Sequence, residues 1–210
     1  MSGARGRFIA FEGGEGAGKS TQARLLAEAL RAQGLTVVVT REPGGTPGAE
    51  AIRSLLLAPP GEGWPPQAEA LLFAAARADH VAHLIRPALA RGEWVICDRF
   101  VDSSRAYQGG AGGLGDDAIT ALHAFGSDGL RPDRVILLEG DESALAGRLA
   151  ARGAAADAIE GRPATYHRAV AAAFSALAEA DPQEFARIDG IGAPDIVHAR
   201  ILAAIDDLLP

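Results

Sequence analysis

The residues best suited to chemistry lie near the N-terminus, in the segment GGEGAGKS at positions 13–20. This segment matches the pattern G-x-x-x-x-G-K-[ST], which binds the phosphates of nucleoside triphosphates. The glycines let successive backbone N–H groups turn toward a phosphate, and a following helix adds the positive end of its dipole. Lys19 would bridge the β- and γ-phosphates, and the Ser20 hydroxyl would be a ligand of Mg²⁺. We therefore expect Mg²⁺ to bind at Ser20, and ATP to bind at Gly13, Gly14, Glu15, Gly16, Ala17, Gly18, Lys19, Ser20 and Thr21.

The sequence on either side of this loop supports the interpretation. Residues 7–12, RFIAFE, read as a buried strand, and residues 19–33 read as a helix. The motif requires this strand–loop–helix context, whereas a glycine-rich turn that holds a lysine by chance does not. The loop alone predicts only a nucleoside triphosphate, because GTPases, motor and partition ATPases and small-molecule kinases all share it. The second substrate must be inferred from other residues.

Charged residues follow the ends of two other predicted strands. Asp98 and Arg99 follow the apolar segment 94–97, and Arg41 follows the segment 36–40. The carboxyl ends of parallel strands open on one edge of a sheet, so we expect Arg41 and Arg99 to converge beside the loop. Asp98 can hold Mg²⁺ through water, as in P-loop enzymes generally, although an Asp–Arg surface pair is the alternative. Two arginines that face the γ-phosphate suit an acceptor that carries its own phosphate, rather than water.

These segments belong to a collinear set that resembles one family, thymidylate kinase of the bacterial type. The set is FEG at 11–13, EGAGKSTQ at 15–22, TREPGGT at 40–46, RSLL at 53–56, LFAA at 72–75, Arg77, RPAL at 86–89, DRF at 98–100, Ser103 and AYQGG at 106–110. REPGG combined with DRF, Ser103 and AYQG is highly specific. The resemblance implies a phosphotransferase that makes dTDP and ADP from dTMP and ATP in dTTP biosynthesis.

The resemblance also implies roles for individual residues. Arg41 and Arg99 correspond to the clamp on the dTMP phosphate and act in catalysis with Lys19 and Arg152. Glu15 corresponds to an acid that faces the 3′-hydroxyl of the sugar and the metal-bound phosphates. The nucleophile would be a phosphate oxygen that is already anionic, so no general base is needed, and the chain offers no obvious catalytic dyad.

The base and the sugar of dTMP would contact a second group of residues. The resemblance places Phe73 against thymine, Arg77 at a thymine carbonyl, and Ser104 near the base N3 with Gln108 close by. Tyr107 corresponds to the tyrosine that closes on the sugar and disfavours a 2′-hydroxyl. Without the resemblance, Phe73 on an alanine-rich helix would be read as core, Arg77 as a surface arginine and Tyr107 as a half-buried tyrosine.

The predicted lid, at about 153–162, departs from the family pattern. Arg152 and Gly153 are present, but Ala158 and Ala169 stand where the family has arginines, and the loop carries Gly16 instead of an arginine. The remaining candidate lid cations are Arg148, Arg152, Arg162 and Arg168. An arginine that acts alone on the transferring phosphoryl group is worth on the order of 10³–10⁵ in rate. Either another arginine substitutes, or turnover is depressed.

The elements that position these residues alternate between apolar runs and amphipathic stretches, which indicates an α/β fold of the P-loop type. We expect a five-stranded parallel sheet flanked by helices, in a single domain over 1–210 with a small mobile lid. The expected strands are 7–12, 36–40, 93–98, 134–138 and 184–188, and the expected helices are 19–33, 47–57, 67–91, 116–125, 142–151, 163–180 and 194–208. The glycine-rich segment 109–115 reads as a flexible loop. The resemblance implies a homodimer.

The bulk composition narrows the functional class. The chain has 210 residues, 27 of them acidic and 20 basic, for a net charge of −7. An acidic surface repels phosphate backbones, so we do not expect a nucleic-acid binder. The single cysteine, Cys97, fits a reducing compartment and packing inside a strand. We see no secretory or membrane-spanning segment and expect a cytoplasmic protein.

Three other functions remain as alternatives. One is a protein that binds nucleotides as a sensor without catalytic turnover, and the incomplete lid is the only feature of the sequence that supports it. Another nucleoside monophosphate kinase would need a different base pocket, and Phe73, Arg77 and Ser104 do not form a recognisable purine-specific set. A P-loop ATPase would need a water-positioning residue and leaves REPGG unexplained.

Overall fold

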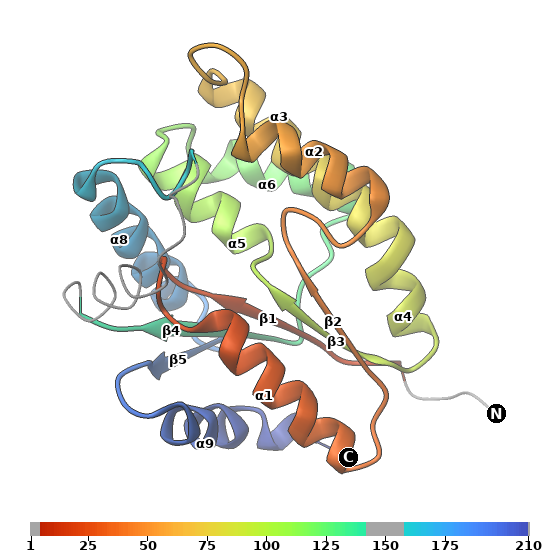
Figure 1. The fold of residues 1–210 in the computed structure, drawn as a ribbon. Coiled ribbons are helices and arrows are strands. Elements are labelled where there is room, and N and C mark those ends of the chain that lie inside the picture. The colour runs from red at the N-terminus through yellow and green to blue at the C-terminus, as the bar shows by residue number, and fades with distance from the viewer. Residues whose placement is uncertain (1–4, 142–157, 210) are drawn as a thin grey trace.

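The computed structural model describes residues 5–141 and 158–209. Within them, five strands form one parallel sheet in the order β2–β3–β1–β4–β5. The strands are β1 (Phe8–Glu12), β2 (Val37–Arg41), β3 (Trp94–Asp98), β4 (Arg134–Glu139) and β5 (Phe185–Asp189). All five expected strands are confirmed. Strand β1 lies in the centre of the sheet, so the glycine-rich loop that follows it lies in the middle of the row of carboxyl-terminal strand ends (Figure 1).

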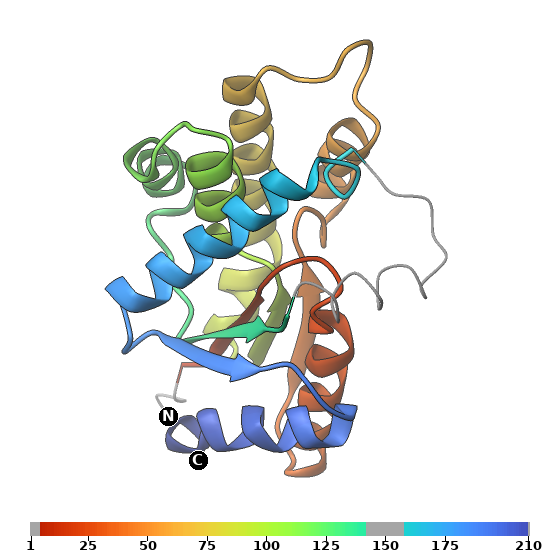
Figure 2. The same ribbon diagram turned by 90° about the vertical axis from the view of Figure 1, so that its left-hand side faces the viewer.

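Helices α1 (Lys19–Ala32) and α9 (Pro194–Ala204) cover one face of the sheet (Figure 1). Alternate side chains of the strands point to this face, so Ile9 and Phe11 of β1 pack with Leu26 of α1 and Ile201 of α9. A short 3₁₀ turn, Asp206–Leu208, follows α9. Figure 2 shows these two helices on the side of the sheet opposite α8.

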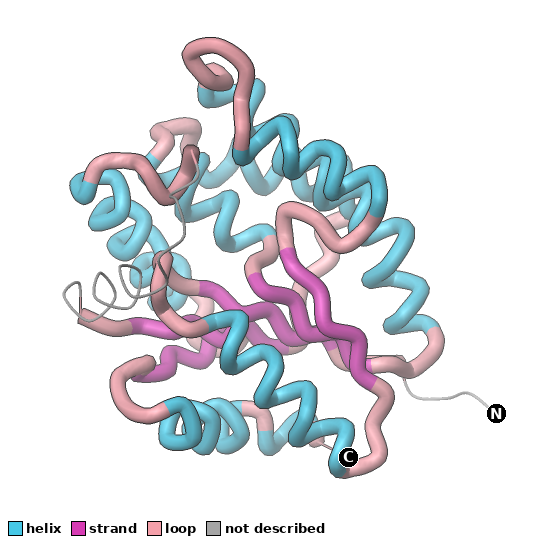
Figure 3. Tube along the Cα trace, in the orientation of Figure 1, coloured by secondary structure: helices cyan, strands magenta, loops and turns pink. Residues whose placement is uncertain are grey.

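The other face carries the remaining helices of the described residues, and Figure 3 shows the strands enclosed between the two helical layers. Phe8 and Ala10 of β1 point to this second face, beneath a core that includes Ile85 and Phe100. A further cluster joins Leu137 of β4 to α8. The helices on this side are α2 (Pro47–Leu57), α3 (Pro66–His80), α4 (Arg86–Ala90), α5 (Val101–Ser104), α6 (Asp116–Ser127) and α8 (Ala164–Ala180). β1 is buried on both faces, as expected for a central parallel strand.

The helix expected over 67–91 forms, but with a change in its winding. A π-helical turn, Val81–Ile85, joins α3 to α4, and the N–H of Arg86 bonds the carbonyl of Val81. Pro87 lacks an N–H and its ring crowds the preceding turn, so a wider turn before it avoids the clash. The chain therefore stays helical through a proline that a regular α-helix would not accommodate.

The segment 101–115 differs from the expectation. A helix begins at α5 and continues as a π-helical stretch, Arg105–Ala111, so the first three residues of the expected loop at 109–115 are helical. A Cβ on Gly110 would lie 2.7 Å from the Cβ of Ala173 in α8. The glycine thus lets two helices approach closely, which a reading of glycine as a sign of flexibility misses.

The expected helix at 142–151 lies outside the described residues, as does the first half of the expected lid, 153–157. Among the helices that the structure describes, none is long and apolar enough to cross a membrane.

Candidate active site

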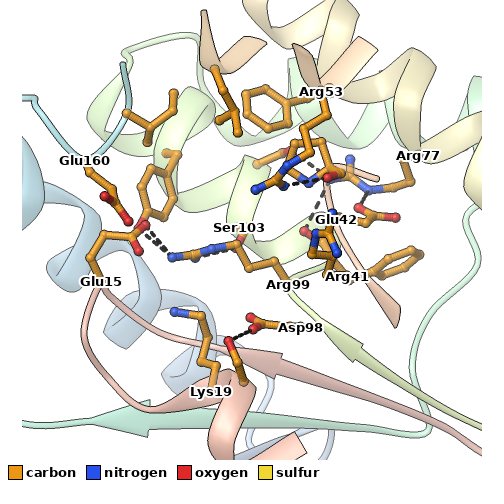
Figure 4. Close-up of a pocket in the computed structure, with 18 of the residues that line it drawn as sticks. Glu15, Lys19, Arg41, Glu42, Arg53, Arg77, Asp98, Arg99, Ser103 and Glu160 are labelled. Atoms are coloured by element: carbon orange, nitrogen blue, oxygen red, sulfur yellow. Dashed lines mark hydrogen bonds and ion pairs between the residues drawn. The ribbon is translucent and has the colours of Figure 1, made fainter. Parts of the chain in front are cut away.

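A cavity of about 520 Å³ opens at the carboxyl ends of β1, β2 and β3, where parallel α/β sheets bind their ligands. Figure 4 shows its lining, with Lys19 and Asp98 on one side, Arg77 on the other and Arg99 between them. The cationic side chains that line it, among the residues described, are Lys19, Arg41, Arg53, Arg77 and Arg99. The cavity is therefore suited to anions, although the chain as a whole is acidic.

The glycine-rich loop closes one end of this cavity. A Cβ on Gly13, where φ is 133°, would lie 2.4 Å from the carbonyl oxygen of Leu138, so only glycine fits there. Helix α1 begins at Lys19, whose buried ammonium donates to the carbonyl oxygens of Gly13 at 3.1 Å and Gly14 at 2.8 Å. Burial, and after it the charge of Arg99, lowers the pKa of Lys19 to about 8.

Ser20 and Asp98 lie together at the start of α1 and the end of β3. The Ser20 hydroxyl donates to the Asp98 carboxylate at 2.5 Å. A hydroxyl and a carboxylate are the oxygen ligands that Mg²⁺ prefers, and Mg²⁺ takes its remaining ligands from phosphates and water. The two predicted metal ligands thus form a donor set that suits this ion. The described residues contain no cluster of three or more His, Cys, Asp or Glu side chains placed to hold a metal ion.

Arg99 is held by contacts from several elements. Its Nη1 donates to the Gly13 carbonyl at 3.1 Å and to the Ser103 hydroxyl at 3.0 Å, and its Nη2 donates to Glu15 at 2.6 Å and Tyr107 at 3.2 Å. Its backbone φ is 70°, a left-handed conformation that costs a non-glycine residue roughly 1–3 kcal/mol. These bonds stabilise the conformation and direct the guanidinium into the cavity.

Arg41 lines the same cavity, opposite Asp98 in the β2–β3 register. Its Nη2 donates to the two carboxylate oxygens of Glu50 at 3.0 and 3.2 Å. This pair is about half exposed, and such pairs contribute less than about 1 kcal/mol. Arg41 can therefore exchange Glu50 for a phosphate at little cost. The predicted convergence of Arg41 and Arg99 beside the loop is present in the structure.

The far wall of the cavity comes from α3 and the 101–111 helix. Half-buried Phe73 lines the cavity and belongs to none of the described core clusters, which disfavours the alternative of a core phenylalanine. Arg77 is buried and donates to Ser104 Oγ at 2.9 Å. Gln108 donates to Glu69 at 2.9 Å, and the Tyr107 hydroxyl donates to Glu15 at 3.1 Å.

In the described part of the expected lid, the side chain of Arg162 does not line this cavity. Arg162 pairs with Glu69 of α3, stacks 4.6 Å above the Tyr166 ring and donates to the Tyr166 hydroxyl. Ala158 is exposed, and Arg168 of α8 lines a neighbouring cavity with Gly14 and Glu15. Arg148 and Arg152, the latter predicted to act in catalysis, lie outside the described residues.

Comparison with known proteins identifies the family. The model of the thymidylate kinase family matches residues 11–201. The chain belongs to the thymidylate kinase family. It is 57% identical over 206 residues to a thymidylate kinase of Rhizorhabdus wittichii, covering 98% of this chain and 99% of that protein. It is 48% identical over 205 residues to one of Chromohalobacter salexigens, covering 97% of each.

A solved structure extends the similarity to the fold. The crystal structure of a thymidylate kinase from Ehrlichia chaffeensis superposes with a TM-score of 0.78 at 32% identity, covering 96% of this chain and 99% of that one. The predicted family, enzyme class and fold class are thus confirmed: this is a kinase with a five-stranded parallel sheet of the P-loop type.

Sequence reasoning missed three residues of this thymidylate kinase site. Glu42 is buried and accepts from Arg77 Nε at 2.7 Å, Arg53 lines the cavity and donates to the Pro43 carbonyl at 2.7 Å, and Glu12 is fully buried behind Arg99. Each of these residues belongs to a segment quoted above for the resemblance, but no role was predicted for it. The signal for Glu12 was an acid at the end of an apolar strand, and the signal for Glu42 was an acid directly after Arg41, the last residue of β2. Arg53 could have been found from its place one helical turn after Glu50, on the same side of α2 as the partner of Arg41.

Proposed function

We propose that this protein transfers the γ-phosphate of ATP to dTMP, giving dTDP and ADP in dTTP biosynthesis. The observation that carries the proposal is the arrangement around one cavity. Lys19 and the glycine-rich loop lie at one end, Arg77 lies at the other, and Arg99 lies between them (Figure 4). Phe73, on the same helix as Arg77, also lines the cavity. A donor triphosphate on the loop and an acceptor base against Phe73 would bring the acceptor phosphate to Arg99.

Catalysis on this proposal is positioning and electrostatic stabilisation. Lys19 and the loop amides hold the donor phosphates, and Arg99 and Arg41 hold the acceptor phosphate against the repulsion between the two anions. The acceptor oxygen is already anionic, so no side chain has to remove a proton. Arg99 is prepared for this role because Glu15, Tyr107 and the Gly13 carbonyl already fix its direction.

Mg²⁺ is the implied cofactor, and Ser20 and Asp98 would hold it. When bound, the ion neutralises charge on the β- and γ-phosphates during transfer. Glu15 lies beside Arg99, where it would face the sugar 3′-hydroxyl of the acceptor.

The base and sugar would be selected by the far wall. Phe73 offers a ring for stacking, and Arg77 offers a donor whose direction is fixed by its pair with Glu42. Ser104 and Gln108 add polar atoms to this wall for the edge of the base. Buried Tyr107 is held by Glu15 and Arg99, and its fixed ring would meet a 2′-hydroxyl on a ribonucleotide.

A coupled assay across monophosphates tests the proposal. We expect ADP release from ATP to depend on dTMP, with a kcat/KM about 10-fold lower for dUMP, which lacks one methyl group. CMP and GMP should be weaker still, because they carry a 2′-hydroxyl and a different base. ADP release that is independent of every monophosphate would indicate an ATPase, and binding without release would indicate a sensor. A purine monophosphate as the best acceptor would also overturn the assignment.

Three further properties are part of the proposal. We infer a single domain over the whole chain, a cytoplasmic location, and a homodimer. The dimer is supported by exposed apolar side chains on the layer of helices that includes α3 and α6. Phe125 of α6 is 93% exposed and Leu71 of α3 is 56% exposed. We expect no nucleic-acid partner and no membrane partner.

A further inference from the structure

A fully buried acid lies directly behind the cavity. Glu12 is the last residue of β1 and is 0% exposed. Its Oε1 accepts from the backbone N–H groups of Phe100 at 2.8 Å and Ser103 at 3.1 Å, and its Oε2 accepts from the Ser103 hydroxyl at 2.5 Å. Glu12 itself does not line the cavity described above. A buried carboxylate is costly unless its bonds are satisfied, so this one requires a structural or functional reason.

The hydrogen bonds of Glu12 connect it to Arg99 through Ser103 and Phe100. Ser103 donates its hydroxyl hydrogen to Glu12 and uses the same oxygen to accept from Arg99 Nη1 at 3.0 Å. The bond from Phe100 N fixes the chain directly after Arg99, where φ is 70°. Glu12 therefore acts on both the backbone turn and the guanidinium of one residue. Figure 4 shows Ser103 close to the Arg99 side chain.

We propose that Glu12 is a positioning residue, which through Ser103 and the turn at Phe100 holds Arg99 toward the acceptor phosphate. The inference rests on the proposed function, in which Arg99 grips dTMP. The ionised carboxylate makes the serine a donor to Glu12 and leaves the serine oxygen to Arg99. A protonated Glu12 would instead donate to that oxygen, so the serine hydroxyl would lose its carboxylate acceptor and turn, which weakens its hold on Arg99.

The charged and titratable groups around Glu12 set the pH at which its carboxylate becomes protonated. Burial, and after it the charge of the Asp102 carboxylate, raises the pKa of Glu12 to about 7, although the hydrogen bonds from Ser103 and Phe100 and the charge of Arg99 oppose the rise. Lys19 of α1 and the Cys97 thiol of β3 also lie within the electrostatic reach of Glu12. The grip on the acceptor should therefore weaken as the pH falls through about 7. The dTMP phosphate also titrates, near pH 6, so only a difference between variants isolates Glu12.

The test compares Glu12→Gln, Ser103→Ala and Ser103→Thr with the wild type. For Glu12→Gln and Ser103→Ala we expect kcat/KM for dTMP to fall at least about 10-fold, with KM for ATP changed less than about two-fold. Ser103→Thr keeps the hydroxyl and should retain most of the activity. The ratio of wild-type to Glu12→Gln kcat/KM for dTMP should rise with pH across about 6 to 8, because the substrate contributes equally to both profiles.

Asp133→Asn is the matched control. Asp133 also accepts a backbone N–H of β1, from Phe8 at 2.7 Å, but at the end of the strand away from the cavity. Its loss should leave the kinetics of both substrates unchanged.

Two results would overturn the inference: a Glu12→Gln variant with wild-type kcat/KM for dTMP, or an equal loss for both substrates in Glu12→Gln and Ser103→Ala. A wild type that never phosphorylates dTMP would instead refute the proposed function. In that case crystal structures decide the inference. An Arg99 guanidinium in the same place in wild type and Glu12→Gln refutes it, and a displaced one supports it.

Discussion

At the scale of single residues, the protonation of Lys19 should set the alkaline limit of donor binding. Its pKa is lowered to about 8, mainly by burial, so the free enzyme loses this charge as the pH rises above that value. kcat/KM reports on the free enzyme, and bound phosphates favour the charged amine. We therefore expect kcat/KM for ATP to fall above pH about 8, while kcat persists to higher pH. Steady-state kinetics at saturating dTMP across this range measure both limits.

Lys19→Arg separates this explanation from a general alkaline loss. A guanidinium stays charged throughout the range, so the alkaline limb of kcat/KM for ATP should move upward even if the absolute rate is low. A limb at the same pH in both proteins would mean that another group titrates there.

Glu12 should also make stability depend on pH, in the direction opposite to most carboxylates. Its pKa is about 7 in the folded protein, against an ordinary 4.5, so the folded state holds a proton that the unfolded state has lost between these values. Stability should therefore fall as the pH rises through this window, by up to about 3 kcal/mol from this group. Urea unfolding of wild type and Glu12→Gln should show the variant gaining relative stability from pH 5 to 8. A difference that does not vary with pH would contradict the assignment.

At the scale of elements, the lid raises the question of which arginine serves the transferring phosphate. Arg162 is committed to Glu69 and Tyr166, whereas Arg168 shares a cavity with Gly14 and Glu15 of the loop. We expect Arg168→Ala to lower kcat by on the order of 10³ and Arg162→Ala to lower it much less. Single-turnover kinetics with both variants give the comparison, since each removes one guanidinium from the same region.

Ala158→Arg tests whether the lid lacks a necessary arginine, because it places one where the family pattern has it. If Arg168 already substitutes for the missing arginine, the replacement should leave kcat nearly unchanged. A large gain in kcat would mean that turnover is depressed in the natural chain. Unchanged activity in Arg168→Ala would exclude Arg168 and leave Arg148 and Arg152 as the remaining candidates.

The same elements show how far the sequence could predict the fold. The three inner strands, β1, β3 and β4, were predictable because a central parallel strand is buried on both faces and is therefore apolar with little interruption. The cluster of Lys19, Ser20, Asp98, Arg41 and Arg99 was predictable because parallel topology brings strand ends together. In these cases the local sequence pattern and the geometry of a parallel sheet predict the same positions.

The helix over 101–111 was not predictable in the same way. Its polar residues are buried because they bond across the structure, as Ser104 does to Arg77 and Gln108 does to Glu69. Gly110 permits close contact with Ala173 of α8, which lies far away in the sequence. The pairings of Glu12 and Glu42 depend likewise on segments far apart in sequence, so no local pattern reports them.

At the scale of the whole molecule, charge is distributed unevenly. The chain carries −7 overall, yet the cavity is lined by Lys19, Arg41, Arg53, Arg77 and Arg99. These cations outnumber the carboxylates on the same lining, which are Glu15, Glu42, Asp98 and Glu160. The cavity therefore attracts anions, while an acidic exterior discourages extended polyanions such as nucleic acids. The distribution therefore favours small phosphorylated ligands that fit inside the cavity. Positive charge elsewhere on the described surface is largely paired, as for Arg187 with Glu139 and Arg134 with Asp207.

The apolar exterior bears on the assembly of the molecule. Leu71 lies two helical turns before Ala78, so both lie on one stripe of α3, and Ala78 Cβ is 3.3 Å from where a Cβ on Gly126 would stand. Leu71 and Phe125 thus lie on neighbouring helices that contact each other, with their side chains left in solvent. A second copy of this surface would bury both, which is how a two-fold interface forms.

Sedimentation analysis of Phe125→Glu tests this interface. We expect the wild type to sediment as a dimer and the variant to shift toward monomer, because a charge placed on each copy would face its own equivalent across the two-fold axis. Ile196→Glu is the matched control, since Ile196 is 50% exposed on α9, on the opposite face of the sheet. The control should remain dimeric. A wild type that stays monomeric, or a dimer that Ile196→Glu disrupts and Phe125→Glu does not, would place the interface elsewhere or remove it.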